Sequence, residues 1–231
     1  MSFQHVKHVF PSLIKETADD GQRVYTTPDG KRYPSVTTVI ADHNREAIEK
    51  WKDRVGHAKA NKIASNASSR GDVVHEALEA FLQNYPTAEF TKKMLPHAKA
   101  VYLNMKTDIE QHITEVHGIE QPLFSHKLRL AGTTDFVGKY DNLMSIVDFK
   151  TALRLKKLKY LDGYFMQLTA YAFMFQEMTG IRIEQGVILI GVDGETEAQI
   201  FKLPRVEFDP HFRKLVSFRD KYEQREPSWC A

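Results

Sequence analysis

In the N-terminal half of the chain, apolar residues recur every three or four positions, which is the spacing of one face of an α-helix. This spacing predicts one helix over about 44–63. A second helix opens with Ser69 or Asp72 as its N-terminal cap and ends before Pro86, and a third covers about 96–116. The expected buried positions of the three helices are Ile48, Trp51, Val55 and Ala58, then Val74, Leu78, Phe81 and Leu82, then Ala100, Leu103, Ile109 and Ile113.

A shorter stretch before these helices alternates in the manner of strands. Residues 24–33 predict a small hairpin, because the Pro-Asp-Gly sequence at 28–30 supplies the fixed and left-handed backbone that a tight turn needs. The following segment, 34–40, is ambiguous. Ser35 or Thr37 would cap a short helix, whereas the run of β-branched residues is equally typical of a strand.

From Ile119 onward the apolar period changes to two, which is typical of β-strands. Pro122 lies near the start of the first of these strands, a position that suits an edge strand. Gly180 supplies the left-handed residue that ends a long helix. The strands predicted in this half cover 120–128, 132–139, 143–151, 186–192 and 197–203, and the helices cover 160–178 and 210–224. This order predicts a mixed β-sheet flanked by helices, of the α/β class.

The length of 231 residues, with 42% hydrophobic residues, is ordinary for a globular protein. We expect one compact unit. Within it, residues 1–69 form the N-terminal hairpin and a helical arm, and residues 70–231 form the core domain.

The chain is nearly balanced in charge, with 32 basic and 30 acidic residues, so affinity for nucleic acid has to come from local patches. One such patch runs from Arg45 to Arg70, where seven lysines and arginines outnumber three acids. The alternative for this stretch is an ordinary solvated helix face.

Cys230 is the only cysteine, which excludes an internal disulfide, a cysteine zinc site and a four-cysteine iron–sulfur cluster. The longest apolar run, 186–192, is too short to cross a bilayer, and residues 1–10 lack the apolar stretch of a signal peptide. These features favour an intracellular, cytoplasmic protein without membrane attachment.

The most informative stretch is the predicted hairpin over 132–151. If Asp141 and Asn142 form its turn, antiparallel pairing places Asp135 directly opposite Asp148. Cross-strand neighbours have Cβ atoms about 5 Å apart, and like charges at that distance are destabilising without a cation between them. Lys150 shares a face with Asp148, because strand side chains repeat every two residues. Two acids and a lysine at one spot indicate a site for a divalent cation beside a phosphate.

The chemistry of these residues suits metal-assisted hydrolysis of a phosphodiester. The carboxylates of Asp135 and Asp148 and the backbone carbonyl of Phe149 are hard oxygen ligands of the kind that Mg²⁺ or Mn²⁺ prefers. Lys150 would orient a water molecule or neutralise charge on the phosphorane. The alternative is a structural ion-pair trio on a sheet edge, since Asp-x-Lys alone is a weak motif.

Four motifs in order resemble a known family. The sequences RGDVVHE at 70–76, GTTD at 132–135, DFK at 148–150 and QLTAY at 167–171 resemble the PD-(D/E)XK nuclease superfamily, in its RecB-type exonuclease branch. PSVTT at 34–38 and the helix around Trp51 further resemble the mitochondrial and phage-encoded exonucleases of that branch. The similarity covers about residues 33–203 and implies a PD-(D/E)XK core with a central mixed sheet.

The resemblance implies a role for each matching residue. Asp135, Asp148 and the Phe149 carbonyl would bind the metal, and Lys150 would be the catalytic lysine. His75, which on its own is typical of a satisfied core histidine, would be a further ligand. An imidazole ligand would shift preference from Mg²⁺ towards Mn²⁺, with activity expected in both.

Three more residues are assigned more loosely. Gln167 and Tyr171 lie four apart on one helix face, which the resemblance places over the active site, against DNA or the catalytic strand. Glu120 stands where related enzymes carry an acid on the first core strand, and it would support a second metal or orient a water. The alternative for Glu120 is an exposed strand acid.

The resulting expectation is a metal-dependent DNA exonuclease that acts on single-stranded or flap ends, with helices before His75 forming an arch for the strand. The alternatives are a structure-specific or restriction-type endonuclease, an inactive nucleic-acid-binding module and an RNA-directed enzyme. Without a helicase motif, we expect the nuclease to act alone or to be recruited by replication or recombination proteins. The candidate DNA-binding residues are Trp51, Arg54, Arg70, Lys156 and Lys157.

Two departures from the family pattern matter. The cysteines that bind an iron–sulfur cluster in related members are absent, and Asp148 stands where many members have glutamate. The substitution keeps the charge and shortens its reach.

Overall fold

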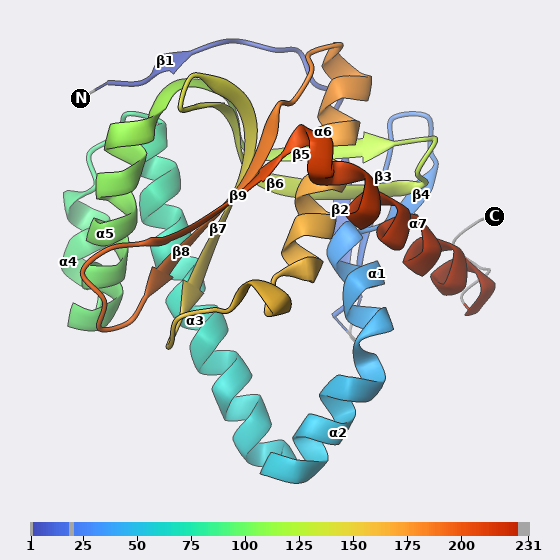
Figure 1. The fold of residues 1–231 in the computed structure, drawn as a ribbon, viewed down its shortest axis with the longest axis horizontal. Helices are drawn as coiled ribbons and strands as arrows, with labels where there is room; N and C mark the ends of the chain where they lie inside the picture. The colour runs from blue at the N-terminus through green and yellow to red at the C-terminus, as the bar shows by residue number, and fades with distance from the viewer. Residues whose placement is uncertain (1, 19–20, 226–231) are drawn as a thin grey trace.

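A computed structural model describes residues 2–18 and 21–225 of the chain, so Cys230 lies outside the described residues. Its centre is a six-stranded mixed sheet (Figure 1). Across the sheet, the strands follow the order β1 (Gln4–His5), β5 (Ile113–Ser125), β6 (Leu130–Tyr140), β7 (Leu143–Ala152), β8 (Gln185–Val192) and β9 (Gln199–Pro204). The β7–β8 pair is parallel, whereas β5, β6 and β7 form an antiparallel run. The predicted mixed α/β class is confirmed.

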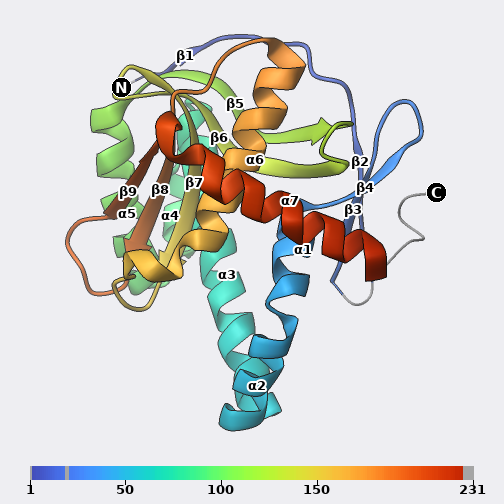
Figure 2. The ribbon, with the colours of Figure 1, turned by 45° about the vertical axis from the view of Figure 1, so that its right-hand side comes forward.

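Helices cover both faces of the sheet, and each face has its own hydrophobic core. Phe136 and Val147 point into the core under α3 (His57–Leu82) and α5 (Pro96–His112). Their neighbours Val137 and Ile146 point into the opposite core, because strand side chains alternate. That second core is built with α1 (Val36–His43), α6 (Asp162–Thr179) and α7 (Phe208–Arg225), and α7 packs across α6 and α1 (Figure 2).

The central hairpin has the predicted turn. Asp141 and Asn142 adopt left-handed backbone, with φ of 52° and 61°, and Tyr140 pairs with Leu143. The paired ladder continues as far as Phe136 and Val147, which is one pair short of Asp135 and Asp148. The predicted register is therefore confirmed over the paired residues.

The remaining elements of the C-terminal half also match the prediction. The left-handed Gly180 ends α6 with φ of 75°, and β8 is buried along its whole length. β9 returns antiparallel to β8 after the turn that contains Gly194. Single turns of 3₁₀-helix occur at Leu158–Tyr160 and Arg205–Glu207.

The predicted N-terminal hairpin is present, and the ambiguous segment after it is a helix. β3 (Arg23–Thr26) and β4 (Arg32–Pro34) join β2 (Ile14–Thr17) in a separate three-stranded sheet. The Ser35 side chain caps α1 by accepting a hydrogen bond from the Thr38 backbone N–H. The patterns had not predicted β1 or β2, because both are short and β2 is exposed along its length.

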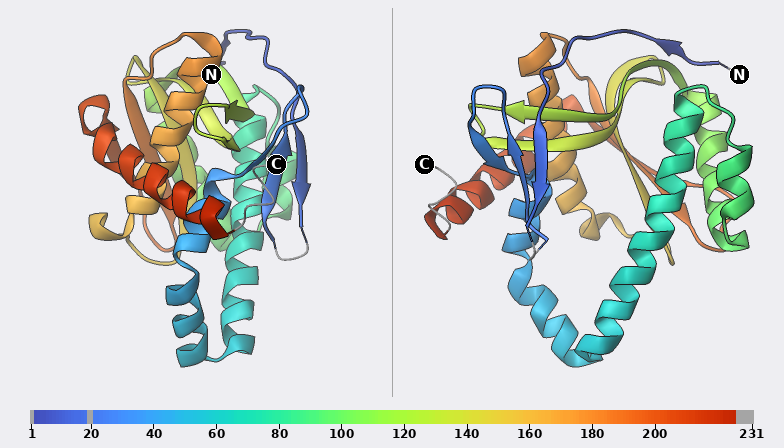
Figure 3. Two further views of the ribbon diagram at one scale, coloured as in Figure 1. Left: turned by 90° about the vertical axis from the view of Figure 1, so that its right-hand side faces the viewer. Right: turned by 180° about the vertical axis from the view of Figure 1, so that it is seen from behind.

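The helical prediction for residues 44–82 is wrong in where the helices divide. Gly56, with φ of 88°, separates α2 (Arg45–Val55) from α3, and α3 then continues unbroken through Ser69 and Asp72. Neither residue is a cap, because the expected break at the serine-rich stretch does not form. α2 and the N-terminal part of α3 project from the body as a V-shaped arm (Figures 1 and 3).

The expected buried stripe of the arm is also wrong, for lack of anything to pack against. No residue of α2 is buried, Trp51 is half-buried and Ile48 is 40% exposed. Trp51 therefore does not belong to the core. Closer to the body the prediction holds, because Val74, Leu78 and Leu82 are fully buried under the sheet.

The third helix ends earlier than predicted, and its buried face is rotated. α5 stops at His112, and the β-branched Ile113 begins β5 and pairs with Tyr140. Ala100 and Leu103 are exposed. The buried positions of α5 are Ala98, Val101, Tyr102, Met105, Asp108 and Ile109. A further short helix, α4 (Ala88–Lys93), precedes α5.

Pro122 occupies an interior position of the longer β5 and faces Thr133 of β6. On its other side β5 pairs only at Glu115 and Val116 with β1, so Pro122 meets no ladder on that side. The edge position expected for this proline is confirmed locally. Among the described residues, no helix has the length and apolar character needed to span a bilayer.

Candidate active site

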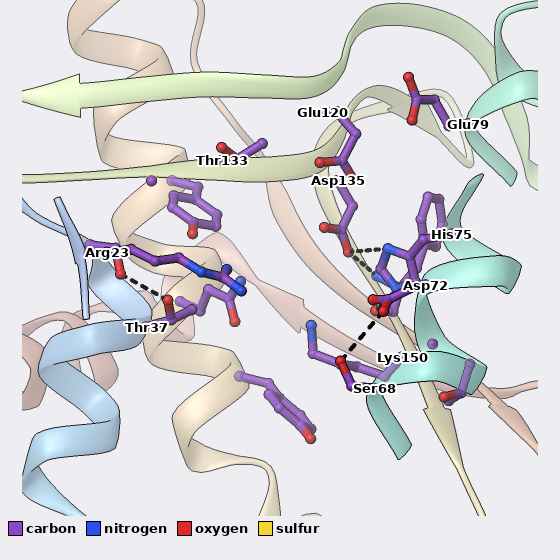
Figure 4. A pocket seen from close by; sticks show the side chains of 18 of the residues that line it. Arg23, Thr37, Ser68, Asp72, His75, Glu79, Glu120, Thr133, Asp135 and Lys150 are labelled. Carbon is purple, nitrogen blue, oxygen red and sulfur yellow. Dashed lines mark hydrogen bonds and ion pairs between the residues drawn. The ribbon is translucent and has the colours of Figure 1, made fainter. Parts of the chain in front are cut away.

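A pocket of about 700 Å³ opens where strands β5, β6 and β7 meet α3 and α6 (Figure 4). It brings together side chains that are far apart in the sequence. The predicted site residues that line it are His75 from α3, Glu120 from β5, Asp135 from β6, Phe149 and Lys150 from β7, and Gln167 and Tyr171 from α6. The sequence motifs thus converge on one cavity.

Three of these side chains form a candidate cation site. Ligand atoms of His75, Glu120 and Asp135 all lie within 4.8 Å of one another, and Figure 4 shows the three side chains pointing toward one another. One imidazole nitrogen and two carboxylates form a donor set that suits a divalent ion such as Mn²⁺ or Mg²⁺. The residues present therefore fit a divalent metal.

Backbone groups of β7 hold two members of this set. Oδ2 of Asp135 accepts a hydrogen bond from the Phe149 N–H at 2.7 Å. Nε2 of His75 lies 3.0 Å from the Phe149 carbonyl oxygen, which can only accept, so Nε2 carries the proton. In the neutral ring, the lone pair is then on Nδ1, which lies 4.0 Å from Oδ2 of Asp135. Nδ1 is thus the nitrogen free to bind a cation.

Glu120 is held in an unusual conformation. Its φ of 44° is in the left-handed region, which costs free energy for a residue other than glycine. Desolvation, together with the charges of Asp135 and Glu79, raises the pKa of Glu120 to about 7. Without a cation, the site therefore disfavours a second negative charge beside Asp135.

The buried Asp148 and the half-buried Lys150 form an ion pair next to the cation site. Asp148 is 2% exposed, does not line the pocket, and its Oδ2 lies 2.5 Å from Nζ of Lys150. Burial raises the pKa of Asp148 to about 6, against the opposing effect of the Lys150 ammonium. Burial disfavours the charge on Lys150, yet the carboxylates of Asp148 and Asp135 raise its pKa overall. Lys150 therefore presents a charged ammonium to the pocket.

Gln167 and Tyr171 are both buried on the face of α6 that borders the pocket. Burial raises the pKa of Tyr171 well above 10, so the phenol stays protonated. Gly132 lies against this ring: a Cβ there would be 2.6 Å from the Tyr171 hydroxyl oxygen. The glycine of the GTTD sequence thus allows α6 to pack directly on β6.

The structure adds residues that the sequence had not singled out. Glu79 lines the pocket beside Glu120, and it lies four residues after His75, on the same helix face. That spacing was a signal that could have identified it. Tyr25 and Arg23 enter from the small N-terminal sheet, and the Tyr25 hydroxyl lies 3.0 Å from Thr133 Oγ1. No local pattern could have predicted this contact between separate sheets.

The candidate DNA-binding residues divide into two groups. Arg70, Lys156 and Lys157 line a second hollow of about 450 Å³, which shares Ala67 and Thr151 with the main pocket. Trp51 and Arg54 lie on α2 of the arm and line neither cavity.

A mixed sheet that carries acids, an imidazole and a lysine into one pocket is suited to metal-assisted cleavage of phosphate esters. Comparison with known families identifies the group more closely. Residues 46–227 match the PD-(D/E)XK nuclease superfamily, and the chain belongs to it. The chain is therefore placed among the nucleases by its family.

The chain is similar to two mitochondrial proteins. It is 25% identical to mitochondrial genome maintenance exonuclease 1 of Homo sapiens over 170 residues, which are 68% of this chain and 48% of that protein. It is 26% identical to the Mus musculus protein of the same name over 133 residues, which are 54% of this chain and 38% of that protein. The chain thus spans less than half the length of these relatives.

A solved structure, the crystal structure of SSO0001, aligns with a TM-score of 0.39 and 13% identity, covering 77% of this chain and 71% of that chain. Nothing about the site depends on that alignment.

Proposed function

We propose that this protein is a divalent-metal-dependent DNA exonuclease that acts on single-stranded or flap ends. The observation that carries the proposal is the convergence of His75, Glu120 and Asp135 within 4.8 Å beside the Lys150–Asp148 pair. The similarity to proteins named exonucleases supports the end-directed activity.

In this proposal, His75, Asp135 and Glu120 hold the metal, and His75 binds it through Nδ1. The Phe149 carbonyl orients the His75 ring by accepting from Nε2, and Asp148 holds Lys150 beside the ion. Mg²⁺ and Mn²⁺ both suit the carboxylates, and the imidazole favours Mn²⁺. When bound, the ion supplies Lewis acidity towards the phosphoryl oxygen and lowers the pKa of a coordinated water.

Lys150 is the proposed catalytic lysine. Its ammonium, held by Asp148 at 2.5 Å, orients the attacking water and stabilises the negative charge that develops on the phosphorane. The water oxygen bonds to phosphorus, the ester P–O bond breaks and a proton passes to the leaving oxygen. Gln167 and Tyr171 act as positioning residues, because they are buried where α6 borders the pocket.

The arm is the proposed path of the single strand. α2 and the N-terminal part of α3 project next to the pocket (Figure 3). This arm carries the excess of lysines and arginines, and no residue of α2 is buried. Trp51, Arg54 and Arg70 would contact the strand as it passes. We propose that residues 1–69 and 70–231 act as one unit, since α3 runs through the boundary between them.

The test is digestion of end-labelled linear oligonucleotides in Mg²⁺ and in Mn²⁺. We expect activity in both ions, none in EDTA, and near-complete loss in Asp148→Ala and Lys150→Ala. Covalently closed circular single strands should remain intact. Cleavage of the circles would instead identify an endonuclease, and full activity of either variant or in EDTA would overturn the proposal.

A further inference from the structure

A basic hollow lies beside the pocket, where the chain leaves β7. Its volume is about 450 Å³, and Ala67 and Thr151 line both cavities, so the two are adjacent. Its lining includes four cationic side chains and no acid, whereas the main pocket includes five acids. The cationic side chains are Arg70, Arg154, Lys156 and Lys157. A polyanion that enters the main pocket is thus attracted to this neighbouring hollow.

The loop that forms the hollow is held in place. Gln199 of β9 accepts a hydrogen bond from the Lys156 N–H through Oε1 and donates one to the Lys156 carbonyl through Nε2, both at 2.8 Å. These two hydrogen bonds to the backbone of Lys156 hold the loop in place and leave its charged side chains free of that task. The loop is therefore ordered before any ligand binds, which reduces the entropic cost of binding.

The cationic side chains of the loop are available. Within residues 2–18 and 21–225, no hydrogen bond or ion pair engages the side chains of Arg154, Lys156 or Lys157, and all three residues are exposed. Arg70 also lines the hollow, and its Nε is buried without a hydrogen-bond partner. A buried donor without a partner is costly, and a phosphate oxygen would satisfy it once the side chain turns into the hollow.

An aromatic ring completes the hollow. Tyr160 is 67% exposed, and Lys159 Nζ lies 5.0 Å from the centre of its ring. Leu153 and Leu155, which are 60% and 57% exposed, add apolar surface between the cations. Cations that alternate with an exposed aromatic ring are the arrangement by which proteins bind single-stranded nucleic acid without reading its sequence.

We propose that this hollow is a subsite for single-stranded DNA next to the cleavage site. Tyr160 stacks on one base, and Arg70, Arg154, Lys156 and Lys157 bind the phosphates around it. Gln199 is a positioning residue that holds the loop for this contact. The inference deepens the proposed function and rests on it, because the main pocket would cut the strand that the hollow holds.

Binding is measured by fluorescence anisotropy of a labelled oligothymidylate in EDTA, where no cleavage occurs. Removing a stacked base contact costs affinity, so Tyr160→Ala should raise Kd about tenfold, whereas Tyr160→Phe should bind like the wild type. Tyr85→Ala is the matched control, because Tyr85 is equally exposed at 63% and lies beyond the C-terminal end of α3.

An abasic nucleotide locates the stacked base. When the abasic nucleotide is moved along the oligonucleotide, one position should weaken binding by the wild type. The same position should have no effect on binding by Tyr160→Ala. Removing two phosphate contacts with the double variant Lys156→Ala, Lys157→Ala should reduce the slope of log Kd against log salt by about 1.4, since each contact on a single strand contributes about 0.7. Gln199→Leu should weaken binding without a change in that slope.

The outcomes separate this inference from the proposed function. If the wild type digests DNA and the Tyr160 and lysine variants bind and digest like it, the subsite is wrong and the nuclease stands. If the Tyr160→Ala and double lysine variants lose binding but the wild type digests DNA in no metal, the subsite stands and the proposed function fails. Equal or tighter binding of the wild type to anionic phospholipid vesicles, lost in Tyr160→Ala, would overturn the subsite in favour of a lipid surface.

Discussion

Glu120 stands directly opposite Asp135 across the β5–β6 ladder, because Ile119 pairs with Phe136 and Gln121 pairs with Thr134. Two carboxylates in this relationship repel each other unless one is protonated or a cation lies between them. His75 closes the third side of the same space, within 4.8 Å of both. The arrangement is costly without a metal and becomes favourable with one.

The first prediction concerns Glu120 and pH. Its pKa in the metal-free fold is raised to about 7 from 4.5, so folding favours the protonated form. The stabilisation is fully present below pH 4.5 and is lost as the pH rises to about 7. In EDTA, Glu120→Gln should therefore have a higher Tm than the wild type at pH 8 and a similar Tm at pH 4.5.

The same pair of proteins tests metal binding. Adding Mn²⁺ at pH 8 should raise the Tm of the wild type more than that of Glu120→Gln, because a carboxylate binds the ion and an amide does so weakly. The exposed Glu197 offers a control, and Glu197→Gln should follow the wild type throughout. Equal Tm values for wild type and Glu120→Gln at pH 8 in EDTA would contradict the prediction.

The second prediction separates the catalytic role of Lys150 from its role in stability. Lys150→Ala should lower kcat at least 100-fold and should also lower the Tm at pH 8, because it leaves the buried Asp148 charge unpaired. In the double variant with Asp148→Asn, the unpaired charge is gone, so Tm should recover in part while activity stays lost. Recovery of activity together with Tm would show that Lys150 acts only through stability.

Much of the fold around the candidate site follows from local signals in the sequence. The Asp141–Asn142 turn set the register of the central hairpin, and the alternation of apolar residues set which side chains face each core. The prediction therefore placed the GTTD and DFK sequences on the strands where the structure has them, β6 and β7. Asp135 and Asp148 do not form the predicted cross-strand pair, because the β6–β7 ladder ends one pair earlier, at Phe136 and Val147. The Asp135 carboxylate instead accepts a hydrogen bond from the Phe149 N–H.

What the sequence did not reveal depends on contacts between distant segments. The opposition of Glu120 and Asp135 depends on the register of β5 against β6, in which Ser125 pairs with Leu130, whereas the predicted strand continued to residue 128. The burial of the arm was predicted wrongly, because the apolar spacing around Trp51 indicates a helix but does not show whether another element packs against it. Tyr25 reaches the pocket only through the small sheet.

The third prediction tests the packing of α6 on β6. In Gly132→Ala, the new methyl group would lie 2.6 Å from the Tyr171 hydroxyl and 2.7 Å from its ring, so the ring has to move. We expect a loss of about 1–3 kcal/mol in the free energy of unfolding, together with reduced activity, because Tyr171 borders the site. Urea denaturation measures the first effect.

Gly71→Ala is the matched control for that substitution. Gly71 lies inside α3 and also lines the pocket, but its Cβ would meet the Thr151 hydroxyl at an ordinary 3.8 Å. Alanine is favoured over glycine inside a helix, so this variant should be more stable by about 0.5–1 kcal/mol. A loss of stability in Gly71→Ala equal to that in Gly132→Ala would show that the effect is not steric.

The fourth prediction concerns His75 and the choice of metal. Since Nε2 donates to the Phe149 carbonyl, Nδ1 is the free ligand atom, and replacing the imidazole leaves a site of oxygen ligands. His75→Asn should therefore lose more activity in Mn²⁺ than in Mg²⁺, because imidazole suits Mn²⁺ better than Mg²⁺. An unchanged ratio of the two activities would exclude His75 as a ligand.

The last prediction concerns Trp51 on the arm. A tryptophan in the core costs about 3–5 kcal/mol when it is replaced by alanine. Trp51 is half-buried on a helix that buries nothing, so Trp51→Ala should cost less than about 1 kcal/mol of unfolding free energy. Phe136→Ala is the contrast, because Phe136 is fully buried under α3 and α5.

If the arm guides the strand, Trp51→Ala should still raise KM for single-stranded DNA severalfold with kcat unchanged. A stable variant with normal KM would leave the tryptophan without a role in DNA binding and would count against threading through the arm.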